Sequence, residues 1–135
     1  MLVGGRWNSP GLAVIYAAET YAGALLEVLV HANLSRIPKS HMVIEITIPD
    51  QVTTETVLAA DLKGWDDEDL VASRAFGDRW IKEGRTAVLK VPGVVTDGRE
   101  NNVVINTAHP QFPLIRATAP EPVHWDGRLF RPNRG

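Results

Sequence analysis

Three side chains whose types suit a phosphate-bearing substrate lie near the start of the chain: Arg6, Tyr16 and Glu27. Arg6 stands in a glycine-rich stretch, residues 4–11, whose glycines allow a ligand close to the backbone and whose Pro-Gly ending is typical of a turn. The three groups then come from a turn, a strand and a helix, so a single chain reversal brings them to one pocket. Such a set suits a substrate with phosphates and a transition state that becomes positively charged.

Each of these residues also has a purely structural interpretation. Residues 4–11 fit an exposed turn whose arginine is solvated, as charged loop residues usually are. Glu27 fits an exposed position where it pairs with His31 one helical turn later, a contact that contributes roughly 0.2–0.5 kcal/mol. Against this, the neighbours of Glu27 on the helix surface, such as Gly23 and Ala24, are small and leave room beside the carboxylate.

The elements that position these groups follow from the hydrophobic pattern. Residues 12–17 are apolar and bounded by a turn and by polar residues, which predicts a short buried strand. Residues 19–31 predict a helix that packs by its apolar face and turns Glu27 away from that face. The apolar face consists of Ala22, Leu25, Leu26, Leu29 and Val30.

Further strands and one further helix are predicted along the rest of the chain. The strands are expected at 41–48, 53–58, 86–91, 103–106, 114–118 and 123–125. The helix is expected to start at the acidic residues 66–69 and to end near Glu83, with Gly84 as its C-cap. Its packing face is expected to consist of Leu70, Ser73, Gly77, Trp80 and Ile81. The irregular order of elements predicts an α+β fold: a single compact domain, 1–135, of mixed, mostly antiparallel sheets with packed helices.

Composition narrows the class of protein. The chain has 135 residues, 44% of them hydrophobic, which is enough for one core. Its formal charge of −2 offers no broad basic surface for direct binding of nucleic acid or an anionic membrane. The chain has no cysteine, and its four histidines lack the spacing of metal ligands, so no metal is expected. No apolar stretch predicts a membrane span or a signal peptide, which favours a cytoplasmic protein.

Several motifs occur together along the chain, and the combination is far more specific than any one of them. They are GGRWNSPG at 4–11, VIYAAE at 14–19, ALLEVLVH at 24–31, GDRW at 77–80, AVLKVP at 87–92, Glu100 with Asn102, NTAHP at 106–110 and WDGRL at 125–129. In identity and order they resemble the RES domain, the toxin component of bacterial RES-Xre toxin-antitoxin pairs. The resemblance covers nearly the whole chain.

The resemblance implies a fold similar to ADP-ribosyltransferase toxins, with NAD as substrate and no separate cofactor. Family members degrade NAD by hydrolysis or phosphorolysis, or transfer ADP-ribose to a protein, and a cognate Xre-type antitoxin blocks the pocket. Matched residue by residue, Arg6, Tyr16 and Glu27 fall on the family's catalytic positions. Arg6 and Tyr16 are also expected to bind the substrate, and Asn102 is expected to add a polar contact. The expected assembly is a toxin-antitoxin hetero-oligomer or a homo-oligomer.

Two departures from the family pattern leave alternatives open. A serine normally follows the Val-Pro pair before the polar loop, and in this chain that position is Gly93. The serine is either dispensable, or its absence weakens activity, or Ser9, Ser73 or Thr96 takes over its contact. Relatives usually have a strand before the glycine-rich motif, whereas this sequence begins at Met1, so either the gene start is truncated or that strand is dispensable. The alternatives to an NAD-cleaving toxin are a weakened relative that binds NAD or ADP-ribose, an RNA-cleaving toxin, and a structural subunit that needs its antitoxin for solubility.

Overall fold

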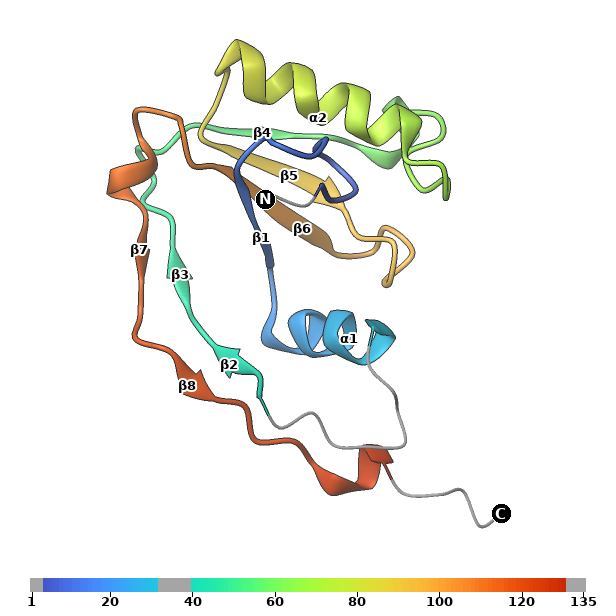
Figure 1. The fold of residues 1–135 in the computed structure, drawn as a ribbon, viewed down its shortest axis with the longest axis vertical. Helices are drawn as coiled ribbons and strands as arrows, with labels where there is room; N and C mark the ends of the chain where they lie inside the picture. The colour runs from blue at the N-terminus through green and yellow to red at the C-terminus, as the bar shows by residue number, and fades with distance from the viewer. Residues whose placement is uncertain (1–3, 32–39, 131–135) are drawn as a thin grey trace.

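A four-stranded sheet forms the centre of the computed structural model, which describes residues 4–31 and 40–130. The strand order is β1-β6-β5-β4 (Figure 1). The strands are β1 (Val14–Ala18), β4 (Thr54–Thr56), β5 (Val88–Pro92) and β6 (Asn101–Asn106). β6 pairs antiparallel with both β1 and β5, whereas β4 pairs parallel with β5. The central strands β5 and β6 are rich in valine, which suits a buried, pleated position.

The helix α2 (Val71–Glu83) lies along one face of this sheet (Figure 1). Its buried residues are Ser73, Gly77 and Trp80, which belong to the predicted packing face. The helix ends at Gly84, whose φ of 62° is left-handed and whose N–H donates to two carbonyls of the last turn. The predicted C-cap is therefore confirmed.

The start of α2 differs from the prediction. Residues 66–69 form turns before the helix instead of its first turn. Leu70 has a left-handed φ of 63°, which α-helical geometry does not allow, so the helix begins one residue later. One acidic residue still serves the helix end, because the Asp69 carboxylate accepts the N–H of Val71 at 3.0 Å.

Tryptophans dominate the core between α2 and the sheet. Trp7, Trp65 and Trp80 are at most 8% exposed. They pack with Val57, Leu89, Val91 and Val104. Trp80 Nε1 donates to the hydroxyl of Thr86 at 2.8 Å, so the indole is buried without losing its hydrogen bond. A second cluster contains Val88, Val103 and Ile105, which alternate along β5 and β6 with the residues of the first cluster, and also Val52 and Ala87.

The glycine-rich turn contacts α2 backbone to backbone. A Cβ at position 77 would lie 1.7 Å from the carbonyl oxygen of Trp7, which no side chain tolerates. Gly77 is therefore the residue that lets the turn of residues 4–11 rest directly on the helix. Because Trp7 is buried in the α2 core, this contact fixes the position of the neighbouring Arg6.

The helix α1 (Tyr21–His31) lies at the end of β1 (Figure 1), and it does not pack as predicted. On the expected apolar face, Leu26 and Val30 are 44% and 59% exposed, and the buried residue of the helix is Gly23. The predicted packing face is only partly buried, because Leu25 and Leu29 are half-buried whereas Ala22 is exposed like Leu26 and Val30. Thr20 and Gly23 let the helix approach Glu100, whose carboxylate accepts a hydrogen bond from the Thr20 hydroxyl at 2.8 Å.

Two short antiparallel ribbons form an arm beside the central sheet (Figure 1). One pairs β2 (Met42–Val43) with β8 (Glu121–Pro122), and the other pairs β3 (Ile46–Thr47) with β7 (Arg116–Ala117). The predicted strand 41–48 is thus split in two, and the strand predicted at 123–125 lies earlier in the chain. Short 3₁₀ helices occupy Ala59–Asp61, Phe112–Leu114 and Gly127–Phe130. Pro113 explains why the strand expected at 114–118 starts late, since proline favours the start of a helical turn.

The predicted α+β class is confirmed: two α-helices pack with mixed, mostly antiparallel sheets over the described residues. Residues 1–3, at the start of the chain, lie outside the described part. Within residues 4–31 and 40–130, no helix combines the length and apolar character needed to cross a membrane. The same residues contain no group of three or more acidic or histidine side chains arranged to hold a metal ion.

Gly77→Ala is expected to destabilise the protein. The new methyl group would meet the Trp7 carbonyl at 1.7 Å, so the glycine-rich turn must move off α2. Overpacking of this kind costs about 1–3 kcal/mol, and a clash with backbone lies at the upper end of that range or above it. Urea unfolding followed by tryptophan fluorescence measures the change. Gly127→Ala is the matched control, because no atom of the described residues lies within 4 Å of its Cβ position. Equal stability of the two variants would contradict the close contact.

Candidate active site

The buried side chain of Asn8 organises the glycine-rich turn. Its Oδ1 accepts the N–H of Gly5 at 2.8 Å and also accepts the hydroxyl of Tyr16. Its Nδ2 donates to the carbonyl of Leu12 at 2.9 Å. Asn8 is 2% exposed, and these bonds satisfy both ends of its amide. The turn and the strand that follows it are thereby tied to one side chain.

Tyr16 lies against the same turn. Its hydroxyl accepts the N–H of Trp7 at 3.0 Å, and a Cβ at Gly5 would lie 2.6 Å from that hydroxyl. Burial raises the pKa of Tyr16 above its ordinary value of 10.0, whereas the Trp7 hydrogen bond and the charge of Arg74 act in the opposite direction. The charge of Asp78 adds to the rise in pKa. The phenol is therefore neutral near pH 7, and 42% of the residue remains exposed.

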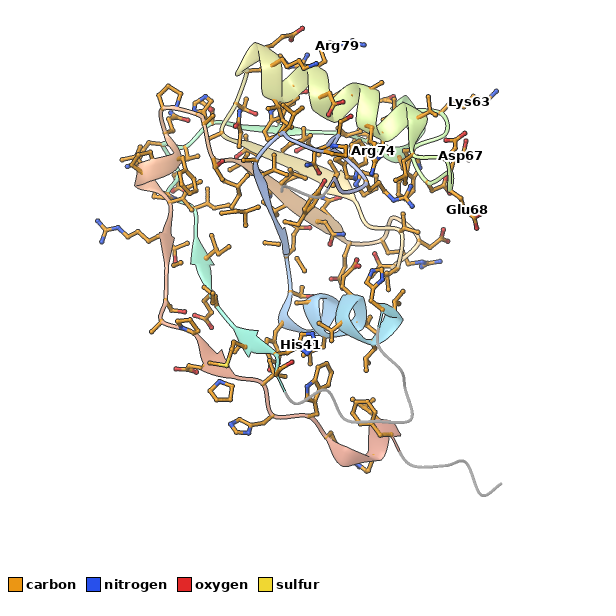
Figure 2. All side chains as sticks on the ribbon, viewed as in Figure 1. His41, Lys63, Asp67, Glu68, Arg74 and Arg79 are labelled. Atoms are coloured by element: carbon orange, nitrogen blue, oxygen red, sulfur yellow. The ribbon has the colours of Figure 1, made fainter. Side chains whose placement is uncertain are left out.

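Arg6 extends toward the loop that precedes α2. Its Nη1 donates to the carbonyl of Trp65 at 3.2 Å and to the carbonyl of Asp67 at 2.9 Å. Asp67 lies in this loop, beside the N-terminal end of α2 (Figure 2). Within the described residues, Nε and Nη2 of Arg6 have no acceptor, so a guanidinium already oriented by the protein retains donors for a ligand.

Glu27 and Asn102 meet at the end of the sheet. Asn102 Nδ2 donates to Glu27 Oε1 at 3.2 Å, and both residues are partly buried. Asn102 pairs with Ala18 and Val104 pairs with Tyr16, so Asn102 and Tyr16 lie on the same face of neighbouring strands. Such diagonal positions are within reach of an aromatic side chain. The alternative of a Glu27–His31 ion pair is not observed among the described residues.

The N-terminus of α1 is fastened to the loop before β6, which places Glu27. The Thr20 hydroxyl accepts the N–H of Gly23 at 2.9 Å as a helix cap and donates to Glu100 at 2.8 Å. The backbone N–H of Asn101 donates to Glu19 at 3.0 Å. Two contacts therefore hold the start of the helix one turn and a half before Glu27.

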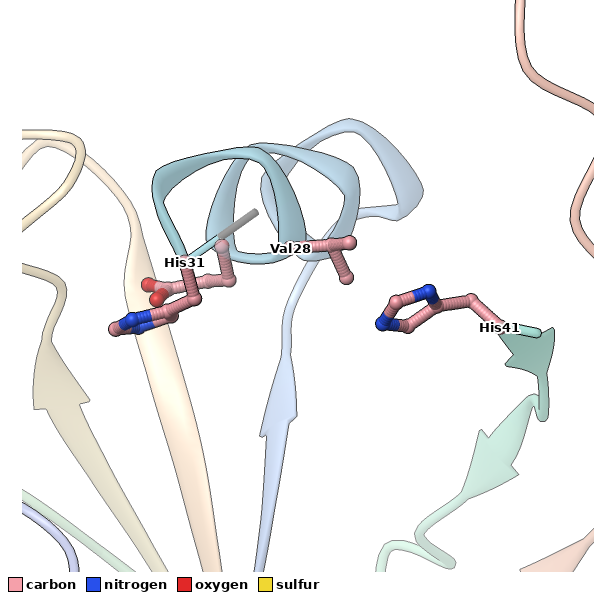
Figure 3. A pocket seen from close by; sticks show the side chains of 4 residues that line it. Val28, His31 and His41 are labelled. Atoms are coloured by element: carbon pink, nitrogen blue, oxygen red, sulfur yellow. The ribbon is translucent and has the colours of Figure 1, made fainter. Parts of the chain in front are cut away.

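Two cavities adjoin these elements. The smaller, of about 310 Å³, is open and lined by Glu27, Val28, His31 and His41 (Figure 3). The larger, of about 830 Å³, lies between β1, α1 and the strand arm, and Tyr16 contributes to its wall. Arg6 and Asn102 line neither cavity.

Comparison with known proteins identifies the family of this chain. The RES domain family profile matches residues 1–126. The chain belongs to the RES domain family. A relative from Sphingobium sp. (strain YBL2), named Prs ADP-ribosylating toxin, is 39% identical over 96% of this chain and 83% of its own length. A Pseudomonas putida protein named Toxin Res is 33% identical over 95% of this chain and 87% of its own length. A Toxin Res from Yersinia enterocolitica is 28% identical over 93% of this chain and 84% of its own length.

In this RES domain, Gly93 lies beside Asn102, the hydrogen-bond partner of Glu27. A Cβ at position 93 would lie 3.5 Å from Asn102 Nδ2 and 3.2 Å from the hydroxyl of Thr96. Of the three hydroxyls considered as substitutes for the family serine, Thr96 is the neighbour of this position. Ser9 donates to Asp78 instead, and Ser73 donates to the carbonyl of Leu70 inside the α2 core.

The RES domain thus brings together part of the predicted constellation. Glu27 and Asn102 are in contact and Tyr16 shares their sheet face, whereas the guanidinium of Arg6 bonds to carbonyls of the loop before α2. The positions were predicted from motifs, but the supporting roles of Asn8, Arg74 and Asp78 were not. A polar pair four residues apart, on either side of the small residue Gly77, was the available signal for the last two.

In Tyr16→Phe, the free energy of unfolding is expected to fall less at alkaline pH than it does in the wild type. The raised pKa means that the unfolded chain loses the phenolic proton first, so the stability due to this group is complete below pH 10.0 and is lost as pH rises through the folded pKa. The variant also leaves the Trp7 N–H without its acceptor, which costs about 1–3 kcal/mol near neutral pH. Urea unfolding from about pH 7 to about pH 11 tests both effects.

The control for this prediction is Tyr21→Phe, because Tyr21 is 51% exposed. It is expected to keep both the wild-type stability at neutral pH and the wild-type alkaline profile. If the Tyr16→Phe protein shows the same alkaline loss as the wild type, the buried phenol does not titrate as described.

Proposed function

We propose that this RES domain is a toxin-type enzyme that cleaves the bond between nicotinamide and ribose in NAD. The observation that carries the proposal is the Glu27 carboxylate, held by Asn102 at the sheet end, on the face that also presents Tyr16. The name of the Sphingobium relative supports it, because ADP-ribosylation draws its ADP-ribose from NAD. The acceptor of ADP-ribose is water, phosphate or a protein side chain.

The chemistry required is the rupture of one glycosidic bond. The bonding electrons leave with the pyridinium nitrogen of nicotinamide, which becomes neutral, and ribose C1′ acquires the positive charge. The acceptor atom, an oxygen or nitrogen, then bonds to C1′ and releases its proton to solvent. A carboxylate near C1′ stabilises the developing cation and can orient the attacking atom. Glu27 fills this role, and the amide of Asn102 holds its carboxylate in one orientation.

Arg6 in the turn and Tyr16 on β1 bind the substrate. The unused donors of Arg6 suit the two phosphates of NAD, because a guanidinium makes paired, charge-assisted bonds to phosphate oxygens. The ring of Tyr16, whose hydroxyl is already bound within the turn, offers its face for stacking on nicotinamide. This arrangement separates the groups that hold NAD from the group that stabilises the transition state.

The partners that accompany this function are NAD and a cognate Xre-type antitoxin that covers the pocket. The names of the Pseudomonas and Yersinia relatives support a toxin. An antitoxin that covers the pocket would compete with NAD, so its binding and NAD turnover would exclude each other.

Glu27→Gln is expected to reduce nicotinamide release from NAD by roughly 10²-fold or more, as for other single electrostatic stabilisers. The amide keeps the size of the side chain and an oxygen for Asn102, so binding of NAD and the stability of the fold should change little. Nicotinamide release is measured on the purified proteins with and without phosphate, and phosphate dependence identifies the acceptor. Glu121→Gln is the control, since Glu121 is exposed on the strand arm and lines neither cavity. Full turnover by Glu27→Gln would remove Glu27 from the mechanism.

A second candidate function, binding of NAD with weakened cleavage, is favoured by one observation. Gly93 supplies no hydroxyl beside Asn102, and the nearest hydroxyl, that of Thr96, is shared with the backbone of Gly93 and Glu100. In such a protein, NAD would raise the thermal stability of the chain without release of nicotinamide.

Gly93→Ser tests whether the missing hydroxyl limits the rate. The serine hydroxyl would lie near Asn102 and Glu27, where an added donor could strengthen the stabilisation of the transition state by about tenfold or more. Gly93→Ala is the control, because it brings the same Cβ, 3.2 Å from the Glu100 carbonyl, without the hydroxyl. Release that rises in the serine variant alone supports weakened cleavage. Equal rates in the serine variant and the wild type mean that the hydroxyl is dispensable.

A further inference from the structure

Two charged residues of α2, Arg74 and Asp78, form hydrogen bonds with the glycine-rich turn. The Asp78 carboxylate accepts both the N–H of Ser9, at 2.8 Å, and the hydroxyl of Ser9. One helical turn earlier, Arg74 Nε donates to the carbonyl of Gly5 at 2.9 Å. Arg74 lies between α2 and the turn (Figure 2). Gly77, between the two, is the position at which the Trp7 carbonyl touches the helix.

These contacts anchor the backbone before and after Arg6 in the sequence. The bonded residues Gly5 and Ser9 flank the segment that contains Arg6, Trp7 and Asn8, so the helix holds both ends of that segment. Both bonds involve a charged partner, and such bonds are shorter and stronger than neutral ones. The charges of Arg74 and Asp78 also act on the Tyr16 phenol. Tyr16 is tied to the same turn, because its hydroxyl accepts the N–H of Trp7 and donates to Asn8. The contacts of α2 with the turn therefore bear on Tyr16 as well as on Arg6.

The other half of the site is fastened differently. Glu27 depends on the bond from Asn102 and on the Thr20–Glu100 contact at the start of α1. None of these contacts uses Arg74 or Asp78. The site therefore has two separately anchored parts, one that carries Arg6 and Tyr16 and one that carries Glu27.

We propose that Asp78 is a positioning residue of this enzyme, which together with Arg74 sets the affinity for NAD by holding the Arg6 turn, without contacting the reacting bond. The inference rests on the proposed function. It follows from the anchoring described above, since a loosened turn displaces the cation that binds phosphate while the carboxylate that stabilises ribose stays in place. Loss of Asp78 consequently affects binding and leaves the chemical step unchanged.

Asp78→Ala is the central variant. It is expected to raise KM for NAD on the order of tenfold or more and to keep kcat within about twofold, the pattern for a lost interaction that contributes equally to ground state and transition state. Asp78→Asn retains an oxygen for the Ser9 N–H and an amide for its hydroxyl, so it should recover most of the affinity, to within about threefold of wild type. Asp50→Ala, an exposed acidic residue in a distant turn, is the matched control.

Ser9→Ala is the second variant, for the case that Asp78→Ala does not fold. It removes the hydrogen bond from the Ser9 hydroxyl to Asp78 and keeps the hydrogen bond from the Ser9 N–H. It is expected to raise KM by less than Asp78→Ala and to leave kcat unchanged. A fall in kcat with KM unchanged, in either variant, would overturn the inference. So would an Asp78→Asn protein that is as impaired as Asp78→Ala.

Amide hydrogen exchange supplies a readout without NAD. In Asp78→Ala, the N–H of Gly5, which is bonded to Asn8, and the N–H of Trp7, which is bonded to the Tyr16 hydroxyl on β1, should exchange faster. The N–H of Gly23 at the cap of α1 should not change. If the exchange rates at Gly5 and Trp7 are unchanged, Asp78 does not stabilise the turn and the inference is overturned. Absence of nicotinamide release from the wild-type protein would instead overturn the proposed function, and the exchange measurement would still decide whether Asp78 holds the turn.

Discussion

The contact between the Trp7 carbonyl and the backbone of Gly77 is the constraint on which the rest of the structure depends. It requires a residue without Cβ at position 77, because any side chain would occupy the space of the carbonyl. Once the turn rests on α2, Trp7 fills the core beside Trp80, and Asp78 and Arg74 reach the turn from either side of the contact. A single close approach thus couples the hydrophobic core to the position of Arg6.

The turn is also a place where buried polar groups are fully used. Asn8 is almost completely buried, and its amide joins Gly5, Tyr16 and Leu12 by hydrogen bonds. Buried polar groups are costly when unpaired and rigidify a structure when paired, so this network orders the turn. As a result, the hydrogen bonds of Asn8 and of the Gly5 and Trp7 N–H groups are made within the protein. Among the described contacts, the guanidinium of Arg6 keeps donors for a ligand.

The contact between Glu27 and Asn102 goes together with an unexpected orientation of helix α1. A helix that carried Glu27 and packed by its leucines would turn the carboxylate away from the sheet. Instead, the small residues at Gly23 and Thr20 face inward, and Glu27 follows them toward Asn102. The cost is exposed apolar surface at Leu26 and Val30, while Leu25 and Val28 line the large cavity beside β1. Glu27 therefore lies against the sheet, where the helical pattern alone favoured an exposed position.

Sequence alone determined the local elements of this protein: the strand at β1, the two helices, the cap at Gly84, the α+β class and the motifs of the RES domain. These depend on periodicity, on glycine and proline, and on residue identity, all of which are local. Only the tertiary structure decided which face of α1 is buried, that Arg6 bonds to the carbonyls of Trp65 and Asp67, and that Asp78 holds Ser9 across 69 positions. Those outcomes depend on contacts between segments distant in sequence, where close approach at a glycine outweighs the hydrophobic pattern of a single helix.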